Sequence, residues 1–295
     1  MNTDLSEKVL FLAAEANGIT GRGSRLIRNG SHAIWETPTG IVARVGERQT
    51  ADVAQREVAI SRWLDRHGLR VVRVIEKFHQ PTIVEGYPVT WWERLPPHRP
   101  ATPAELGALL RVLHRLPLPA TIELPRLAPF GTIRQKLSNA DGAAWISSSD
   151  LAWIVNRLAE LESQYENAVA DIPSGVIHGD AWQGNIAVPH RGEPVVLDLE
   201  DFAVGPQYWD LLPVAVDHTD FARISRPEYE GFVAAYGIDV TTTSAYRTLA
   251  DIQELRWTSY VIGKADYDPA AAREAAHRIA CMRGEKPKPW AWSAF

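Results

Sequence analysis

The sequence predicts an α+β fold in which a small antiparallel sheet precedes a mostly helical region. In the first third of the chain, short alternating runs rich in β-branched residues are separated by turn residues. After residue 102, apolar residues recur at helical spacing. The two patterns meet at the proline-rich stretch 95–100, so we expect an N-terminal lobe of residues 1–95 and a C-terminal lobe of residues 96–295.

The N-terminal elements follow from turn residues and periodicity. Residues 25–46 predict a β-hairpin that turns at Asn29-Gly30-Ser31, followed by a third strand at Ile41–Val45. Residues 51–67 have helical spacing and end at Gly68. Further strands are expected at 71–76, 82–85 and 88–93. We therefore expect this lobe to hold antiparallel strands and one long helix.

The C-terminal elements are mainly helices. Thr102 and Glu105 form a capping box with Pro103 in the first turn, which predicts a helix start. A second amphipathic helix is expected at about 149–169. Residues 176–199 are expected to form short strands and a loop, and the chain should be mostly helical from Asp210 to about residue 283.

Composition restricts the class of protein. The chain has 45% apolar and 23% charged residues, as globular proteins do, and its net charge of −5 argues against a nucleic-acid binder. No apolar run is long enough for a membrane span, and the polar, acidic N-terminus is unlike a signal peptide. Cys281 is the only cysteine, so no intrachain disulfide can form, and we expect a cytoplasmic protein.

One stretch carries the chemistry. His178-Gly179-Asp180 is followed five residues later by Asn185, and Asp198 then ends the apolar run Pro194–Leu197. Phosphoryl transfer needs a carboxylate to orient the acceptor hydroxyl, together with oxygen ligands that hold Mg²⁺ against the phosphates. Asp180 suits the first role, and Asn185 and Asp198 suit the second.

These residues resemble the aminoglycoside phosphotransferase and choline kinase families, small-molecule relatives of protein kinases. The segment Gly205–Leu211 also looks like the glycine-to-Asp-Leu segment of those families. The resemblance implies a two-lobed, protein kinase-like fold with an antiparallel N-lobe and a helical C-lobe. It also implies ATP or GTP as phosphoryl donor, Mg²⁺ as cofactor, and a small-molecule hydroxyl as acceptor.

The resemblance assigns roles to the motif residues. Asp180 is expected to be the catalytic base, with His178 and Asp210 as structural supports of its loop. Asn185 and Asp198 are the expected metal ligands, while Glu200 or Asp201 could lie on the substrate side. The competing interpretations are a capping aspartate at Asp180 and a turn residue at Asn185.

In the N-terminal lobe, the resemblance implies a nucleotide site. Arg44 stands where protein kinases have lysine, and it is expected to contact phosphate and pair with Glu57, although a surface salt bridge is the alternative. The turn residues Gly30 and Ser31 could cover the phosphates. The backbone between Glu93 and Leu95 is expected to hydrogen-bond the nucleotide base.

The acceptor site is the least defined part of the sequence. Candidate residues on the C-terminal helices are Asp217, Asp251, Glu254 and Trp257, and Asp251 and Glu254 share one helical face. Carboxylates with an aromatic side chain favour an amine-bearing acceptor. A solvated helix face is the competing interpretation for each residue.

The sequence therefore predicts a small-molecule kinase, acting on an aminoglycoside-like amine. Two alternatives stay open: a kinase of a neutral sugar or another metabolite, and a nucleotide-binding regulatory module without turnover. A protein kinase is disfavoured, because only eleven residues separate Asp198 from Asp210 and no activation segment is recognisable.

Overall fold

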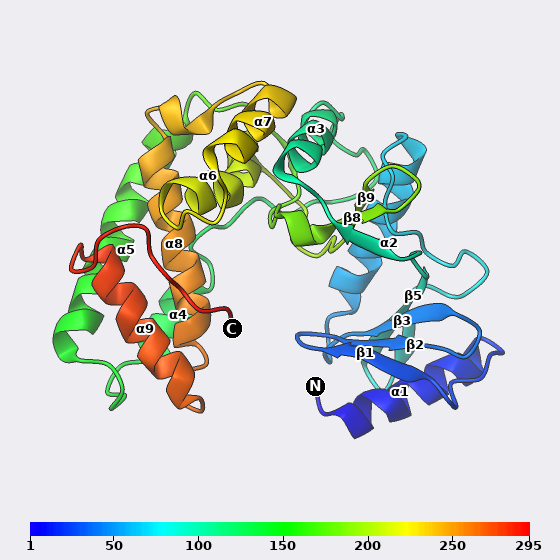
Figure 1. The fold of residues 1–295 in the computed structure, drawn as a ribbon. Helices are drawn as coiled ribbons and strands as arrows, with labels where there is room; N and C mark the ends of the chain where they lie inside the picture. Colours follow the sequence, from blue (N-terminus) through cyan, green and yellow to red (C-terminus); the bar gives the residue numbers. More distant parts are fainter. The chain divides into compact units, whose positions relative to one another are not determined.

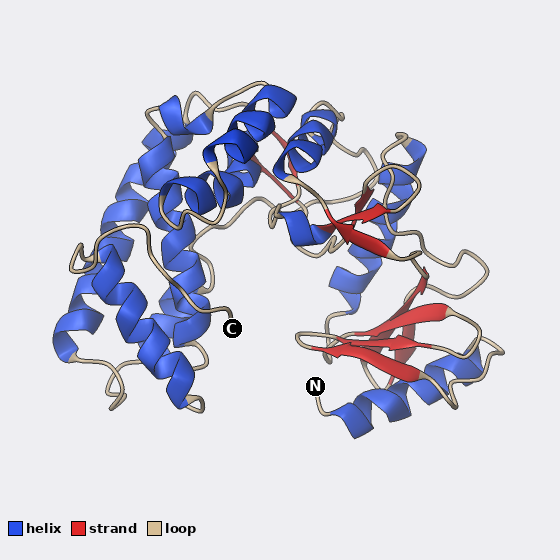
Figure 2. Cartoon of the chain, in the orientation of Figure 1, coloured by secondary structure: helices blue, strands red, loops and turns tan.

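The computed structural model describes all 295 residues, Met1–Phe295. It shows an α+β architecture with an antiparallel N-terminal sheet and a helical C-terminal region, as the sequence predicts (Figures 1 and 2). The chain forms two compact units. Unit 1 comprises Met1–Ala101, Leu116–Pro125 and Gln183–Phe202, and unit 2 comprises Thr102–Arg115, Arg126–Trp182 and Ala203–Phe295.

Unit 1 contains a five-stranded antiparallel sheet in the order β1-β2-β3-β5-β4. Its strands are β1 (Arg25–Asn29), β2 (Ala33–Glu36), β3 (Ile41–Val45), β4 (Thr82–Val84) and β5 (Tyr87–Glu93). The predicted hairpin is confirmed, since β1 pairs with β2 in a register that places Asn29 opposite Ala33. Along β3, alternation buries Ala43 and Val45 on one face and turns Arg44 to the other.

One face of this sheet is covered by α1 (Thr3–Ala16), a helix that the sequence prediction did not include. Asn2 caps it by accepting a hydrogen bond from the Asp4 backbone N–H, and Val9 and Leu10 are fully buried against the sheet core. The expectation of a single helix in the N-terminal region was therefore wrong. The helical spacing of Val9, Leu10, Ala13 and Ala14 is the signal that predicts it.

The predicted helix at 51–67 is confirmed as α2 (Ala51–Arg66). The chain leaves it through Gly68, whose φ of +77° is accessible to glycine at little cost. Glu57 faces inward from α2 and is 3% exposed.

The strand expected at 71–76 is wrong, because this segment makes only isolated bridges. Val71 bridges Val196 in parallel, and Val74 bridges Trp92 in antiparallel orientation. Its hydrogen bonds divide between two sheets: Val72 donates to the Val196 carbonyl, and Ile75 donates to the Trp91 carbonyl. The backbone N–H groups of this segment therefore find their hydrogen-bond acceptors in two different sheets and not along one strand.

A second, three-stranded sheet in unit 1 positions the motif residues. It runs β6-β8-β9, with β6 (His98–Pro100), β8 (Ile186–Pro189) and β9 (Val195–Val196), and the short 3₁₀ helix η1 (Gln183–Asn185) precedes β8. The β8–β9 hairpin pairs Ile186 with Val196, which brings the residues just before β8 alongside those just after β9.

Unit 2 is built mainly from helices. They are α3 (Pro103–Leu113), α4 (Ile133–Asn139), α5 (Ser148–Val169), α6 (Leu212–Thr219), α7 (Arg226–Tyr236), α8 (Tyr246–Ile262) and α9 (Pro269–Met282), with 3₁₀ helices η2 (Gln207–Leu211) and η3 (Val240–Thr242). Thr102 and Glu105 form the predicted capping box of α3. Helix α3 contacts α7 closely at Gly107, where a Cβ would lie 2.8 Å from the Phe232 carbonyl oxygen.

The strands of unit 2 carry the His178 loop. β7 (Ser174–Ile177) pairs antiparallel with β10 (Ala203–Pro206), so the residues after β7 lie at one end of a two-stranded ribbon. None of the helices of the chain has both the length and the apolarity that a membrane crossing requires.

Candidate active site

In unit 2, a buried aspartate holds the loop that carries Asp180. The Asp210 carboxylate is fully buried and accepts hydrogen bonds from the backbone N–H groups of His178 (2.7 Å) and Gly179 (2.9 Å). Gly179 has a φ of +85°, which a side chain would strain. The loop conformation is therefore fixed by hydrogen bonds to its backbone, and the half-buried Asp180 follows directly.

Further contacts brace this arrangement. His114 Nε2 lies 3.0 Å from Asp210, and its Nδ1 lies 2.8 Å from the Tyr236 hydroxyl. The Trp209 indole donates to the Gly179 carbonyl at 3.1 Å. Burial, together with the nearby Asp210 carboxylate, moves the pKa of Tyr236 above its ordinary value. His114 and Tyr236 were not among the predicted site residues, because they come from α3 and α7 and no sequence pattern links them to the loop.

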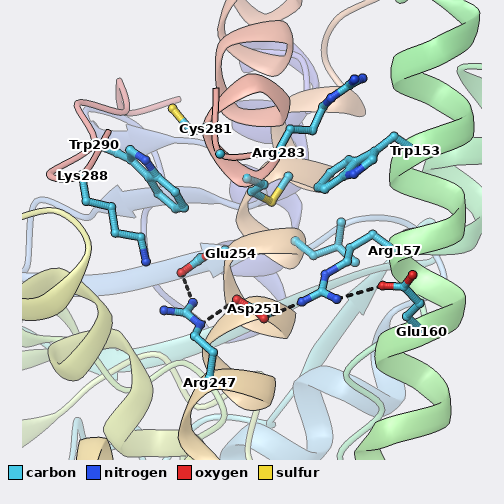
Figure 3. Close-up of a pocket in the computed structure, with 13 residues that line it drawn as sticks. Trp153, Arg157, Glu160, Arg247, Asp251, Glu254, Cys281, Arg283, Lys288 and Trp290 are labelled. Atoms are coloured by element: carbon cyan, nitrogen blue, oxygen red, sulfur yellow. Dashed lines mark hydrogen bonds and ion pairs between the residues drawn. The ribbon is translucent and has the colours of Figure 1, made fainter. Parts of the chain in front are cut away.

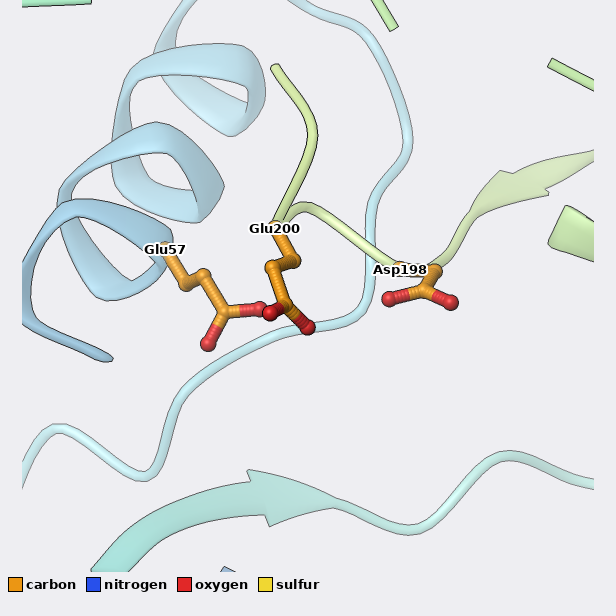
Figure 4. Close-up of side chains that lie close together, drawn as sticks. All are labelled: Glu57, Asp198 and Glu200. Atoms are coloured by element: carbon orange, nitrogen blue, oxygen red, sulfur yellow. The ribbon is translucent and has the colours of Figure 1, made fainter. Parts of the chain in front are cut away.

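In unit 1, Arg44 stands at the centre of three carboxylates, which we name the Arg44 cluster: Glu57, Asp198 and Glu200. Arg44 Nη1 pairs with Glu57, and its Nη2 lies 2.8 Å from Glu200 and 4.0 Å from Asp198. One oxygen from each of the three carboxylates lies within 4.8 Å of the others (Figure 4). The predicted Arg44–Glu57 pair is thus formed on the inner side of α2.

Charge and burial perturb this cluster. Burial raises the pKa of Glu57, although the Arg44 guanidinium opposes the change. A hydrogen bond with His32, with help from Arg44, lowers the pKa of Glu200. Asp198 has a φ of +52°, a left-handed conformation that costs energy in a residue other than glycine. Its side chain is 49% exposed, so the chain turns a carboxylate outward at a strained position.

The two predicted metal ligands approach one another through the β8–β9 hairpin. The Leu197 backbone N–H donates to the Asn185 carbonyl at 2.9 Å, so Asn185 lies beside the residue preceding Asp198. Asp198 contributes to a group of three carboxylates around one guanidinium, which leaves the group with negative charge in excess. Oxygen donors with an excess of negative charge fit Mg²⁺.

Two of the other predicted nucleotide contacts, Gly30 and Glu93, already use their backbone N–H groups in hydrogen bonds within the chain. The Gly30 backbone N–H donates to the His32 carbonyl at 3.1 Å inside the β1–β2 turn, and Ser31 is exposed. The Glu93 N–H donates to the Arg73 carbonyl at 2.8 Å, and the half-buried Leu95 follows β5. His32, which the sequence prediction passed over, lies 2.8 Å from Glu200. Its position in the predicted phosphate turn was the available signal.

The predicted acceptor residues do not form one group. Asp251 and Glu254 line a pocket of about 470 Å³ between α5, α8 and the segment after α9, and Asp217 and Trp257 are not part of its lining. Asp217 pairs with Arg223 at 3.1 Å, and burial raises the pKa of Asp217. The Trp257 ring lies 6.1 Å from the Phe221 ring.

The pocket carboxylates belong to what we name the Arg247 cluster: Asp220, Asp251 and Glu254 around Arg247. Figure 3 shows Arg247 between Asp251 and Glu254. Arg247 also reaches Asp220 at 2.8 Å. Arg157 pairs with Asp251 at 2.6 Å and with the exposed Glu160, and Lys288 pairs with Asp220 at 2.6 Å. Every carboxylate of this cluster is therefore bonded to a cation.

The pocket opens on the face of α8 away from the His178 loop. Arg256 lies over the Trp209 ring at 5.0 Å, and Trp209 bonds the loop at Gly179. Arg256 is five residues from Asp251 and two from Glu254, which places it on roughly the opposite side of the helix. Asp251 and Glu254 thus face away from the residues that hold Asp180.

A family model matches most of the chain. The family model described as the phosphotransferase enzyme family matches residues 28–252. No curated protein matches the chain. Among solved structures, a choline/ethanolamine kinase family protein from Mesorhizobium loti has a TM-score of 0.65 at 17% identity, covering 98% of this chain and 97% of that one.

Two aminoglycoside phosphotransferase structures are also similar. APH(3'')-Id from Streptomyces rimosus has a TM-score of 0.64 at 18% identity, covering 85% of this chain and 98% of that one. The GDP and kanamycin complex of APH(2")-IIia has a TM-score of 0.66 at 12% identity, with coverages of 90% and 94%. Likeness at these identities shows the fold, which is the kinase-like α+β fold that the resemblance implied. The family model spans most of the chain, and the chain therefore belongs to the phosphotransferase enzyme family.

Proposed function

We propose that the protein is a Mg²⁺-dependent kinase that transfers the γ-phosphate of ATP or GTP to a hydroxyl group of a small molecule. The observation that carries the proposal is the Arg44 cluster. It combines a guanidinium suited to phosphate with more carboxylates than that guanidinium can neutralise. A phosphate and a divalent cation would each find a partner there.

Each group of residues has its own role in this proposal. Asp198 and Asn185 hold Mg²⁺, which neutralises charge on the phosphates, and Arg44, positioned by Glu57, binds a phosphate oxygen. Asp180 orients the acceptor hydroxyl and accepts its proton late in the transfer. Asp210 and His178 keep the loop of Asp180 in place. The backbone of Glu93 to Leu95 and the turn at Gly30 and Ser31 border the nucleotide.

Two acceptor classes remain in this proposal. An amine-bearing acceptor would use the carboxylates of Asp217, Asp251 or Glu254, with Trp257 nearby. A neutral acceptor such as a sugar is the second candidate, and two observations favour it. All three carboxylates already have arginine partners, and Asp251 and Glu254 face away from the elements that hold the His178 loop.

A coupled assay of nucleotide consumption tests the function. ATP and GTP are each offered with Mg²⁺ and with choline, ethanolamine, kanamycin, spectinomycin or glucose. Asp180→Ala should lower kcat by roughly 10²-fold or more and leave nucleotide affinity nearly unchanged. Asp171→Ala is the matched control, because Asp171 is an exposed aspartate of the same unit. Turnover by Asp180→Ala at the level of this control would remove Asp180 from the catalytic role.

A further inference from the structure

One carboxylate oxygen in unit 1 has two cationic or hydrogen-donating partners. Glu200 Oε2 lies 2.8 Å from Arg44 Nη2 and 2.8 Å from His32 Nε2. Arg44 lies on β3, and His32 lies in the turn immediately before the neighbouring strand β2. Glu200 is 168 residues away from His32 in the sequence. The arrangement is an anion-binding site that a carboxylate of the chain occupies.

His32 is held mainly by this interaction. Its Nδ1 is buried and has no hydrogen-bond partner. Beside it is a cavity of about 10 Å³, lined by His32, Arg44 and Glu57 among others. That volume is roughly the size of a single water. The Gly30 N–H is used within the β1–β2 turn, whereas the His32 side chain lines the same cavity as Arg44.

Arg44 can exchange one partner without losing the other. Its Nη1 pairs with the buried Glu57, whereas its Nη2 points to Glu200. The Glu200 side chain is 40% exposed, so it can turn into water at little cost, while the buried Glu57 side chain cannot. A guanidinium edge and an imidazole N–H bind a phosphate oxygen by the same hydrogen bonds as a carboxylate oxygen.

We propose that Glu200 is a stand-in anion for a nucleotide phosphate, and that His32 is a phosphate-binding residue. In the absence of nucleotide, Arg44 and His32 bind the Glu200 carboxylate. A nucleotide phosphate displaces that carboxylate and takes over both donors, while Arg44 keeps its bond to Glu57. This inference rests on the proposed function, because it assumes that Arg44 contacts the nucleotide.

The stand-in role makes an unusual prediction, a gain of affinity on mutation. Glu200→Gln removes the competing charge, so ADP or GDP should bind about fivefold more tightly in EDTA, the size of one partly exposed ion pair. Glu193→Gln is the matched control, since Glu193 lies between β8 and β9, seven residues before Glu200, and pairs with Arg70 at 2.7 Å and not with Arg44. Misfolding cannot imitate a gain of affinity.

Variants at His32 test whether this residue binds phosphate. His32→Phe should weaken ADP or GDP binding roughly tenfold, and His32→Gln, which keeps an N–H donor, should recover part of the loss. Both are measured by isothermal titration calorimetry, with EDTA and with Mg²⁺. If His32→Phe and His32→Gln bind ADP and GDP like the wild type, His32 is not a phosphate ligand.

The outcomes separate this inference from the proposed function. If Glu200→Gln binds ADP and GDP in EDTA with the affinity of the wild type, and the wild type binds normally, the stand-in role of Glu200 alone is overturned. A loss of affinity confined to Mg²⁺ would make Glu200 a metal ligand and would also overturn it. Failure of the wild-type chain to bind ADP or GDP under both conditions would overturn both the inference and the proposed function.

Discussion

The two compact units each contain a cluster of three carboxylates, and the clusters differ in how many cations surround them. In the Arg44 cluster, three carboxylates share one guanidinium and the His32 imidazole. Even with His32 protonated, one negative charge remains. In the Arg247 cluster, three carboxylates are bonded to three cations, namely Arg157, Arg247 and Lys288.

The difference separates a site for a cation from a structural network. Two of the three carboxylates of the Arg44 cluster are exposed, at 49% for the Asp198 side chain and 40% for that of Glu200, and the excess charge of the cluster would be relieved by Mg²⁺. The side chains of Asp220 and Glu254 are 3% and 2% exposed. The ion pairs of the Arg247 cluster join α8 to α5 through Asp251 and Arg157, and join Asp220 to α8 and to the segment after α9. Acidic residues alone therefore do not identify a binding site; the number of cations bonded to them must be counted as well.

The largest effect on nucleotide binding is expected at Arg44. Arg44→Ala should raise the nucleotide KM roughly 10- to 100-fold, the value of a charge-assisted hydrogen bond, and Arg44→Lys should keep part of the activity. Steady-state kinetics with varied ATP or GTP measure both variants. An unchanged KM in Arg44→Ala would mean that the ion pairs of the Arg44 cluster are only structural.

The next effect concerns stability and not binding. Arg247→Met leaves three carboxylates short of a partner and should lower the free energy of unfolding by about 2 kcal/mol, below the cost for a fully buried pair because Arg247 is 44% exposed. Nucleotide affinity should not change. Arg226→Met, which removes an exposed pair with Glu230, serves as the control in urea unfolding. If Arg247→Met unfolds at the same urea concentration as Arg226→Met, the network is not structural.

A smaller effect decides the role of the pocket carboxylates in acceptor binding. If an amine-bearing acceptor uses them, Asp251→Asn with Glu254→Gln should raise its KM several-fold, about 1 kcal/mol, more than kcat falls, and high salt should weaken binding. If the Arg247 cluster is only structural, the melting temperature changes while the acceptor KM does not. The second result would move the proposal to a neutral acceptor.

The smallest expected effect is a pH dependence. Burial raises the pKa of Glu254, so the folded protein binds that proton more tightly than the unfolded chain does. Its stabilising contribution is therefore present below the unfolded pKa of about 4.3 and is lost as pH rises through the folded pKa. The stability of Glu254→Gln relative to wild type should rise with pH above about 4.3. If the difference in unfolding free energy between Glu254→Gln and the wild type does not change with pH, the predicted rise is contradicted.

Local sequence patterns predicted the elements that local interactions determine. The strand Ile41–Val45, helix α2 and the capping box of α3 all agree with the structure, because alternation, helical spacing and turn residues act within a few positions. The segment 71–76 was mistaken for a strand because its hydrogen bonds go to two different sheets, which no local pattern encodes.

In the candidate site, too, the residues close in sequence could be predicted and the pairs distant in sequence could not. The spacing of His178, Asp180 and Asn185 lies within one loop and could be read directly. The pairing of Arg157 with Asp251 joins residues 94 apart, and that of His32 with Glu200 joins residues 168 apart. The sequence could therefore show which carboxylates are present, but the fold decides which of them are neutralised.

The Mg²⁺ dependence of nucleotide binding tests the central claim most directly. ADP and GDP affinities are measured by calorimetry with Mg²⁺ and with EDTA for the wild type, Asp198→Ala and Asp251→Ala. We expect Mg²⁺ to tighten binding by the wild type and by Asp251→Ala, and to have no effect on Asp198→Ala. Of the two clusters, the Arg44 cluster has more carboxylates than cations, whereas the Arg247 cluster has equal numbers of both. A normal Mg²⁺ response in Asp198→Ala, or its loss in Asp251→Ala, would contradict the account.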